Sequence, residues 1–299
     1  MFKTLCNRHN EASYESVGKS YKGRDIWLFK IGNPNGGRVL WDGCMHGWED
    51  MGSEIMYLLA EWLLKSGDPK AEEILRTNWT LLIPVVNPDS YERENRNFTE
   101  CQYGVDLNRN FKQGWSWVPC NPYPNCYRGN SAASEPETKV MRNVFDRFKP
   151  HQYINTHYGG GPSLAYYAEE SLSVINPILA RINELSSQMN VTPYTVRSVS
   201  SIGYAVGDAH NFGAVTWLLE TEGGPGCYMH TEHPYSMIVD TYFPKCLPIF
   251  IALNEVCGKE IVLPTVFMPR IREILCEKFP RAIDVYARID KMRMSRQNL

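Results

Sequence analysis

The sequence lacks an excess of charge of either sign. It contains 31 lysine and arginine residues against 33 aspartate and glutamate residues, which gives a formal net charge of -2. No long basic run occurs before the last dozen residues. Proteins that bind nucleic acid concentrate lysine and arginine on one face or along one helix. We therefore expect no nucleic-acid partner.

Long apolar runs are also missing. The N-terminal stretch MFKTLCNRHNEASYES has no apolar core of the kind that a signal peptide carries. Runs such as residues 249–253 are far shorter than the roughly 20 residues that a membrane-spanning helix needs. We therefore expect a soluble, cytoplasmic protein with no membrane partner. Secretion is the alternative if a signal segment that is removed precedes this sequence.

The cysteines form neither a regular C-x-x-C array nor a disulfide scaffold. There are 9 of them in 299 residues, and reduced thiols are the expected state. Cys101, Cys120 and Cys126 gather around the polar loop VPCNPYPNCYRG. One disulfide within this group stays open as an alternative in an oxidising compartment.

Short apolar runs alternate with amphipathic stretches along the chain, and 43% of the residues are hydrophobic. This alternation predicts an α/β fold with a large core. The turn cluster at residues 32–37 further indicates a hairpin between the first two predicted strands. Strands are expected at residues 26–31, 38–45, 79–86, 151–156 and 213–219, and helices at residues 53–65, 134–148 and 175–189.

A long irregular stretch covers about residues 87–130 and is rich in Asn, Arg, Gly, Pro and aromatic residues. Loops of this length inside a compact domain are usually functional. Its segment GVDLNRNF places Asn108 beside Arg109. A guanidinium and an adjacent amide suit the recognition of a carboxylate, although a salt bridge within the loop would use the same residues.

Polar residues stand at or just beyond the ends of three predicted strands: His46 with Glu49, then His157, then Glu220. In open α/β sheets, ligands bind in the crevice beyond the carboxyl ends of the strands. Two imidazoles and a carboxylate are donors that zinc prefers, with one position left open for chemistry. Each residue alone could be a polar turn residue, but their convergence favours a metal site. Glu222 is the alternative to Glu220 as the polar site residue at the third strand end. Glu220 is preferred because it directly follows the apolar run.

These motifs resemble those of the zinc metallocarboxypeptidases of the carboxypeptidase A type, or funnelins, from about Tyr21 to about Gly224. The resemblance implies a single α/β domain at residues 1–258 with a central mixed, twisted sheet flanked by helices. A helical C-terminal extension is expected at residues 259–299, outside the resemblance. The matching motifs, in chain order, are H-x-x-E at 46–49, NPD at 87–89, RENR at 93–96, GVDLNRNF at 104–111 and the two strand ends at His157 and Glu220.

The resemblance implies zinc-dependent hydrolysis of the C-terminal peptide bond of a peptide or protein substrate. One alternative is an amide hydrolase on the same scaffold, either an N-acyl amino-acid deacylase or a cell-wall peptide amidase. Another is a catalytically silent protein that binds C-termini. The implied roles are one zinc ion on His46, Glu49 and His157, orientation of His46 by Asp106, a general base at Glu220, carbonyl polarisation by Arg93, and substrate carboxylate binding by Asn108 and Arg109.

The sequence also departs from the digestive members of this family. Trp48 stands where those enzymes carry an arginine between the metal histidine and glutamate. The mobile tyrosine of the family has two candidates here, Tyr204 and Tyr194. The floor of the specificity pocket falls near Gly207 and Asp208, with an ambiguous alignment. The preferred terminal side chain, like the oligomeric state, therefore stays open.

Overall fold

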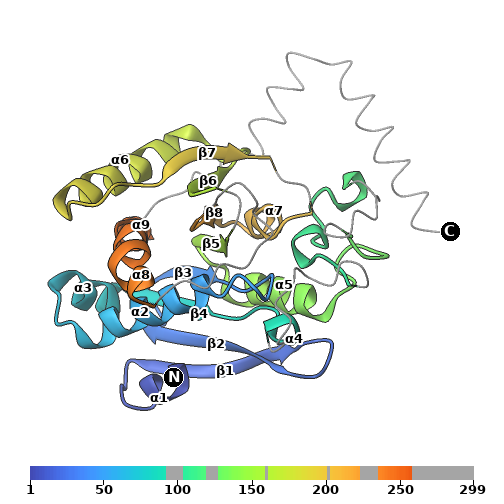
Figure 1. Ribbon diagram of the computed structural model, residues 1–299, viewed down its shortest axis with the longest axis horizontal. Helices are drawn as coiled ribbons and strands as arrows, with labels where there is room; N and C mark the ends of the chain where they lie inside the picture. The colour runs from blue at the N-terminus through green and yellow to red at the C-terminus, as the bar shows by residue number, and fades with distance from the viewer. Residues whose placement is uncertain (92–103, 119–126, 159–160, 201–202, 223–234, 258–299) are drawn as a thin grey trace. The chain divides into compact units, whose positions relative to one another are not determined.

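A computed structural model describes residues 1–91, 104–118, 127–158, 161–200, 203–222 and 235–257 (Figure 1). The chain divides into two compact units, Met1–Lys259 and Glu260–Leu299, and every described residue belongs to the first. The predicted helical extension at residues 259–299 therefore lies outside the described residues.

An eight-stranded sheet with the order β1-β2-β4-β3-β5-β8-β6-β7 forms the centre of the first unit. The four middle strands, from β4 to β8, run parallel, and antiparallel pairs join β1 to β2, β2 to β4 and β6 to β8. The predicted mixed sheet is confirmed. The strands are β1 (Ala12–Lys19), β2 (Asp25–Gly32), β3 (Gly37–Asp42), β4 (Asn78–Ile83), β5 (Gln152–His157), β6 (Ser163–Tyr167), β7 (Thr195–Val199) and β8 (Val215–Glu220).

Helices cover both faces of this sheet (Figure 1). One apolar layer packs under α1 (Phe2–Cys6), α2 (Met51–Lys65), α3 (Pro69–Thr77), α6 (Leu172–Gln188) and α9 (Phe243–Cys257). The opposite layer packs under α5 (Pro136–Phe148) and α7 (Ala205–Asn211). The shorter elements are α4 (Pro88–Tyr91), α8 (Tyr235–Met237), η1 (Leu107–Arg109), η2 (Trp115–Trp117) and η3 (Ile238–Tyr242).

The hairpin predicted between the strands at residues 26–31 and 38–45 is wrong. Those strands are β2 and β3, and β4 lies between them in the sheet. Because β3 is almost entirely buried, it takes a central place between two parallel neighbours, whereas β2 pairs with the outer strand β1. Strand β3 also ends at Asp42, before Cys44 with its left-handed φ of 48°. Strand β4 ends at Ile83 because Pro84 has no N–H for the ladder.

The helical stretch Tyr235–Cys257 is long and apolar enough to cross a membrane by length and composition alone. Half of its most apolar window is buried inside the protein. Cys246, Phe250 and Leu253 on this stretch belong to the apolar layer beneath α2 and α6. A core helix of a globular domain has the same length and composition, and the burial of this stretch is of that kind.

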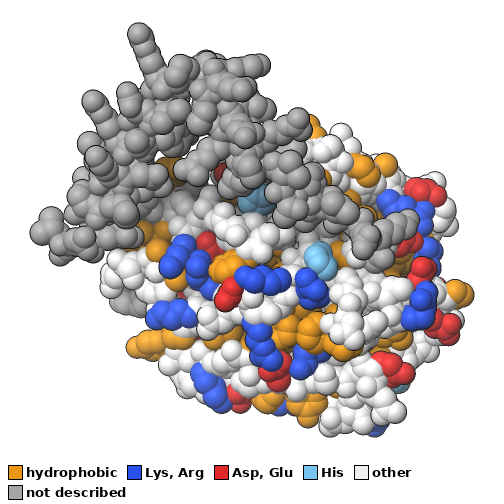
Figure 2. All heavy atoms as spheres, turned by 180° about the vertical axis from the view of Figure 1, so that it is seen from behind, with side chains coloured by type: hydrophobic (Ala, Val, Ile, Leu, Met, Phe, Trp, Pro, Cys, Tyr) orange, Lys and Arg blue, Asp and Glu red, His pale blue; other side chains and the backbone are white. Residues whose placement is uncertain are grey.

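Charged side chains of both signs are interspersed on the face drawn in Figure 2. Many of the ion pairs join different elements, for example Lys30 with Glu15 across β1 and β2. Arg147 on α5 reaches the same Glu15 at 2.9 Å. This mixture follows from the nearly balanced charge of the sequence.

Glu255 on α9 links three helices. Its carboxylate accepts hydrogen bonds from Arg181 on α6 at 2.6 and 2.9 Å, and from Lys70 on α3 at 2.8 Å. Charge-assisted, bidentate contacts of this kind are stronger than neutral hydrogen bonds. Glu255 therefore links the end of α9 to the start of α3 and the middle of α6.

Replacing Glu255 with glutamine is expected to destabilise the protein at neutral pH and to matter less in acid. Arg181 lowers the pKa of Glu255 from 4.5 to about 2, with burial opposing and Lys70 assisting. Because the folded-state pKa is the lower one, the stabilisation is full above about pH 4.5 and is lost as the pH falls toward 2. Urea unfolding of both proteins between about pH 7 and pH 3 measures this. An equal effect of the substitution at both ends of the range would contradict it.

Candidate metal centre

The loop between β3 and α2 carries the first two predicted ligands. The N–H of Glu49 donates to the carbonyl of His46 at 3.0 Å, which closes a turn holding both side chains on one side. Gly47 within this turn must be small, because a Cβ there would lie 2.4 Å from the backbone carbon of Ser90. His157, the third predicted ligand, is the last residue of β5, the strand beside β3.

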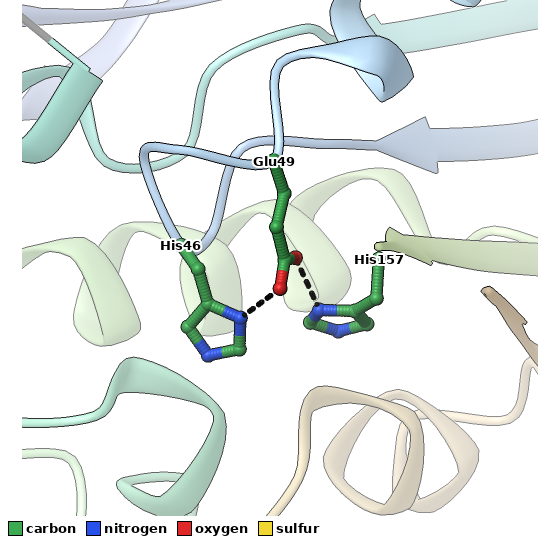
Figure 3. Close-up of side chains that lie close together, drawn as sticks. All are labelled: His46, Glu49 and His157. Carbon is green, nitrogen blue, oxygen red and sulfur yellow. Dashed lines mark hydrogen bonds and ion pairs between the residues drawn. The ribbon is translucent and has the colours of Figure 1, made fainter. Parts of the chain in front are cut away.

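The three side chains converge (Figure 3). The carboxylate of Glu49 lies between the two rings, with Oε1 2.8 Å from Nδ1 of His46 and Oε2 2.8 Å from Nδ1 of His157. One donor atom from each residue lies within 4.8 Å of the others. Glu49 and His157 are buried, with exposed fractions of 5% and 4%. Two imidazole nitrogens and one carboxylate form the donor set of a zinc site that keeps a position open, so these residues fit zinc.

The charges around this cluster are mutually supportive. Burial lowers the pKa of His46, but Glu49 and Asp106 outweigh it and raise that pKa well above its usual value. Burial raises the pKa of Glu49 and of Asp106, but His46 and His157 outweigh it at Glu49, and His46 with Arg109 outweighs it at Asp106, so both pKa values are lowered. The two carboxylates thus stay ionised in a buried site, where they favour a bound cation.

Asp106 lies behind His46, as the sequence predicts. Its Oδ1 is 3.1 Å from Nε2 of His46, the ring nitrogen that faces away from Glu49. Asp106 is also the N-cap of η1, where its side chain accepts a hydrogen bond from the N–H of Asn108 at 2.9 Å. A carboxylate on the outer nitrogen fixes the tautomer and orientation of a metal histidine.

Asn108 and Arg109, the predicted carboxylate-binding pair, lie beside this cluster. The amide of Asn108 is buried, with Nδ2 2.9 Å from Nε2 of His157 and Oδ1 accepting from the N–H of Ala205 at 3.0 Å. The guanidinium of Arg109 lies 4.3 Å from the ring centre of Tyr204. The structure thus places Asn108 behind a metal ligand, and its contact with substrate stays a prediction.

Glu220 and Glu222 lie in different surroundings. Glu220 is the direct neighbour of His157 in the parallel ladder of β5 and β8, so both side chains lie on the same face of the sheet. The carboxylate of Glu222 hydrogen-bonds with Tyr242, which belongs to the apolar layer under α2, α6 and α9 on the other face of the sheet. Burial and this contact raise the pKa of Tyr242. Of the two candidate bases, Glu220 is the one on the side of the metal centre.

The two candidate tyrosines are also separated. Tyr204 lies at the start of α7 against Arg109. Tyr194 is 7% exposed, and its hydroxyl lies 3.4 Å from the carbonyl of Thr221 and 3.8 Å from Sγ of Cys246. Tyr204 is therefore the candidate beside a predicted substrate-binding residue.

Asp208 does not offer a free carboxylate. It is 1% exposed and pairs with Arg142 of α5, and it accepts a hydrogen bond from the N–H of Gln113 at 2.9 Å. A Cβ on Gly207 would lie 2.9 Å from the side chain of Gln113. Among the described residues, the side chain closest to Gly207 is therefore the neutral Gln113.

Trp48, between the two ligands, is directed into the protein. Its side chain is 4% exposed and packs edge-on against Tyr158 with ring centres 5.4 Å apart. An arginine here would have to bury its charge against an aromatic ring. The departure from the digestive enzymes is thus a packing residue.

Several predictions made from the sequence fall on residues that are not described. These are Arg93 in the RENR motif and the cysteines at 101, 120 and 126. The cysteines within the described residues carry free thiols: Cys6, Cys44, Cys246 and Cys257.

Asp42 and Asn155, which were not predicted as site residues, lie behind His157. Both are fully buried, and Nδ2 of Asn155 donates to Oδ1 of Asp42 at 2.7 Å. A signal for them existed, because each is a polar residue within or at the end of an apolar strand, in RVLWD and QYINTH. Buried polar groups need partners, so such residues mark a hydrogen-bond network.

Comparison with known proteins agrees with this geometry. The chain is 26% identical to carboxypeptidase M of Mus musculus over 199 residues, covering 60% of this chain and 41% of that protein. It is 25% identical to carboxypeptidase B of Helicoverpa zea over 227 residues, covering 65% and 52%. The chain thus spans about half the length or less of these relatives.

Solved structures share the fold. Thrombin activatable fibrinolysis inhibitor superimposes with a TM-score of 0.74 at 17% identity, over 87% of this chain and 75% of that one. Carboxypeptidase A from Helicoverpa armigera gives a TM-score of 0.68 at 19% identity, over 86% and 72%. The family model Peptidase_M14, described as zinc carboxypeptidase, matches residues 1–222. With this match over most of its length and a zinc-type donor set at the strand ends, the chain belongs to the zinc carboxypeptidase family.

Proposed function

We propose that this protein hydrolyses the C-terminal peptide bond of peptides or proteins in a reaction that depends on one zinc ion. The observation that carries the proposal is the convergence of His46, Glu49 and His157, with Glu220 next to His157 in the ladder. A metal held by three protein ligands with a carboxylate alongside is the arrangement of a metal-assisted hydrolase.

Bound zinc would supply Lewis-acid polarisation of the scissile carbonyl and would make an attacking water more acidic. Glu220 takes a proton from the water while the oxygen of that water bonds to the carbonyl carbon. The carbon–nitrogen bond then breaks, and Glu220 returns the proton to the leaving amine. Arg93 stabilises the negative charge that develops on the carbonyl oxygen.

Recognition of the terminal carboxylate is assigned to Arg109. The side chain of Arg109 is 23% exposed, and its Nη1 donates to the carbonyl of Asn108 at 3.0 Å. Stacking on Tyr204 restricts the guanidinium to this position. Arg109 can thus offer a positive charge to a substrate while Asn108 supports the metal centre from behind.

The test is a panel of peptides, N-acyl amino acids and cell-wall peptides, incubated with and without a chelator. The expected result is release of single C-terminal amino acids from peptides, abolished by the chelator and restored by added zinc. Turnover that persists without metal would contradict the zinc mechanism. Turnover of N-acyl amino acids or cell-wall peptides alone would replace carboxypeptidase activity by amide hydrolysis, and zinc-dependent peptide binding without turnover would indicate a silent binding protein.

A further inference from the structure

A chain of buried hydrogen bonds runs from His157 to a carboxylate inside the sheet. Asn155 lies two residues before His157 on the same face of β5, and its Oδ1 is 2.5 Å from Nε2 of His157. Its Nδ2 donates to Oδ1 of Asp42 at 2.7 Å. The hydroxyl of Tyr153 donates to Oδ2 of Asp42 at 2.6 Å. His157 is therefore connected to a buried carboxylate through one amide.

This chain fixes which way the amide of Asn155 faces. An ionised carboxylate only accepts hydrogen bonds, so the NH₂ of Asn155 faces Asp42 and its carbonyl faces the ring. Both oxygens of Asp42 are acceptors, Oδ2 from Tyr153 and Oδ1 from Asn155, and these hydrogen bonds oppose the burial that raises the pKa of Asp42 to about 6. The carbonyl in turn requires a hydrogen on Nε2 of His157. The other ring nitrogen, Nδ1, lies 2.8 Å from Oε2 of Glu49 and is then the one that would give up its hydrogen to a bound metal.

Asn108 approaches the same ring nitrogen from a different element. Because its Oδ1 accepts from the N–H of Ala205, its NH₂ points into the cluster behind His157. That Nδ2 is 2.9 Å from Nε2 of His157 and 3.5 Å from Oδ1 of Asn155. Nε2 thus lies between a donor, the amide of Asn108, and a closer acceptor, the carbonyl of Asn155 at 2.5 Å. The shorter contact favours a hydrogen on Nε2, directed at the carbonyl of Asn155.

We propose that Asp42 and Asn155 are positioning residues of the metal centre, which set the tautomer of His157 so that Nδ1 is presented to the metal. They would do for His157 what Asp106 does for His46, so both histidines would bind through Nδ1. The inference rests on the proposed zinc-dependent function. It assigns a role to a buried carboxylate that is not itself in contact with any of the three ligands.

The test compares zinc affinity in Asn155→Ala, Asp42→Asn and Asn78→Ala, by competition with a chromophoric chelator. Loss of a group that orients a metal histidine is expected to weaken zinc binding by about 10–100-fold in the first two variants. Asn78 is the matched control, a buried asparagine at the start of β4 whose Nδ2 donates to the carbonyl of Asn254 at 2.9 Å. Asn78→Ala should lose stability but retain the zinc affinity of the original protein.

Nitrogen–proton correlation spectra of the zinc-loaded protein give a second readout. The expected pattern has the hydrogen of His157 on Nε2, and Asp42→Asn should disturb it even if Asn155→Ala fails to fold. Zinc affinity in folded Asp42→Asn equal to that of the original protein, or a hydrogen on Nδ1 of zinc-bound His157, would overturn the proposal. Because zinc binding is measured apart from peptide cleavage, a protein that binds zinc in the expected pattern but cleaves nothing would count against the proposed function alone.

Discussion

Replacing Glu220 with glutamine is expected to lower kcat for peptide hydrolysis by about 10²–10⁴-fold, the usual contribution of a general acid–base group. Glutamine keeps the shape of the side chain but cannot accept the proton of the attacking water. Because Glu220 is not among the three converging donors, zinc affinity should not change. Steady-state kinetics together with zinc competition measure both quantities, and KM should change much less than kcat.

Glu222→Gln is the matched comparison for this experiment. The carboxylate of Glu222 hydrogen-bonds with Tyr242 in the apolar layer under α2, α6 and α9. Loss of this carboxylate should therefore affect stability more than turnover. Full activity of Glu220→Gln combined with an inactive Glu222→Gln would move the general base to Glu222. That outcome would also mean that the segment after β8 rearranges when substrate binds.

Replacing Glu49 with glutamine is expected to weaken zinc binding by more than the 10–100-fold that typically follows loss of an outer partner, and to remove peptidase activity at low zinc concentration. Glu49 is the only anionic donor of the three and contacts Nδ1 of both histidines at 2.8 Å. Glutamine would offer one neutral oxygen and would leave the buried site without its central charge. Activity measured against added zinc should show a shifted midpoint.

Glu54→Gln serves as the control for that substitution. Glu54 lies in the first turn of α2, is half-buried, and is not one of the converging donors. Its substitution removes the same charge close by and should leave zinc affinity unchanged. A Glu49→Gln variant that binds zinc as tightly as Glu54→Gln would exclude Glu49 as a ligand.

Much of the metal centre could be predicted from the sequence, because its residues lie at the ends of apolar runs. His157 and Glu220 end β5 and β8, which pair with each other in parallel, and parallel strands bring their carboxyl ends to one edge. The H-x-x-E spacing then needs only one turn to bring His46 and Glu49 together. These relations depend on local pattern and on one general rule of sheet topology.

Other parts of the fold depend on tertiary partners that local pattern does not reveal. Strand β1 is half-exposed along its length and β7 is almost entirely exposed, so neither has a strong apolar signal. Helix α3, which was not predicted, begins with Asp68 as N-cap and Pro69 as the first helical residue. Strand β4 lies between β2 and β3, so the turn cluster at residues 32–37 does not join the two strands into a hairpin.

The partners of Asp42 and Asn155 were hidden for the same reason. Both segments were interpreted as strands, and that interpretation assigns no role to the polar residues inside them. Which polar residues meet is decided by the register of β3 against β5, where Asp42 is the direct neighbour of Asn155. Register between strands so far apart in the chain cannot be derived from either segment alone.

Glu49 and His157 are 108 residues apart in the sequence. A metal bound to both would therefore cross-link the chain in addition to its role in catalysis. A bound ion would close a long loop of the unfolded chain, as a disulfide does, and would tie the loop before α2 to the end of β5. Resistance to unfolding should therefore rise with the concentration of free zinc according to mass action. The centre of the sheet and the loop that begins α2 would then melt as one unit when zinc is present, and the loop could open separately when it is withdrawn.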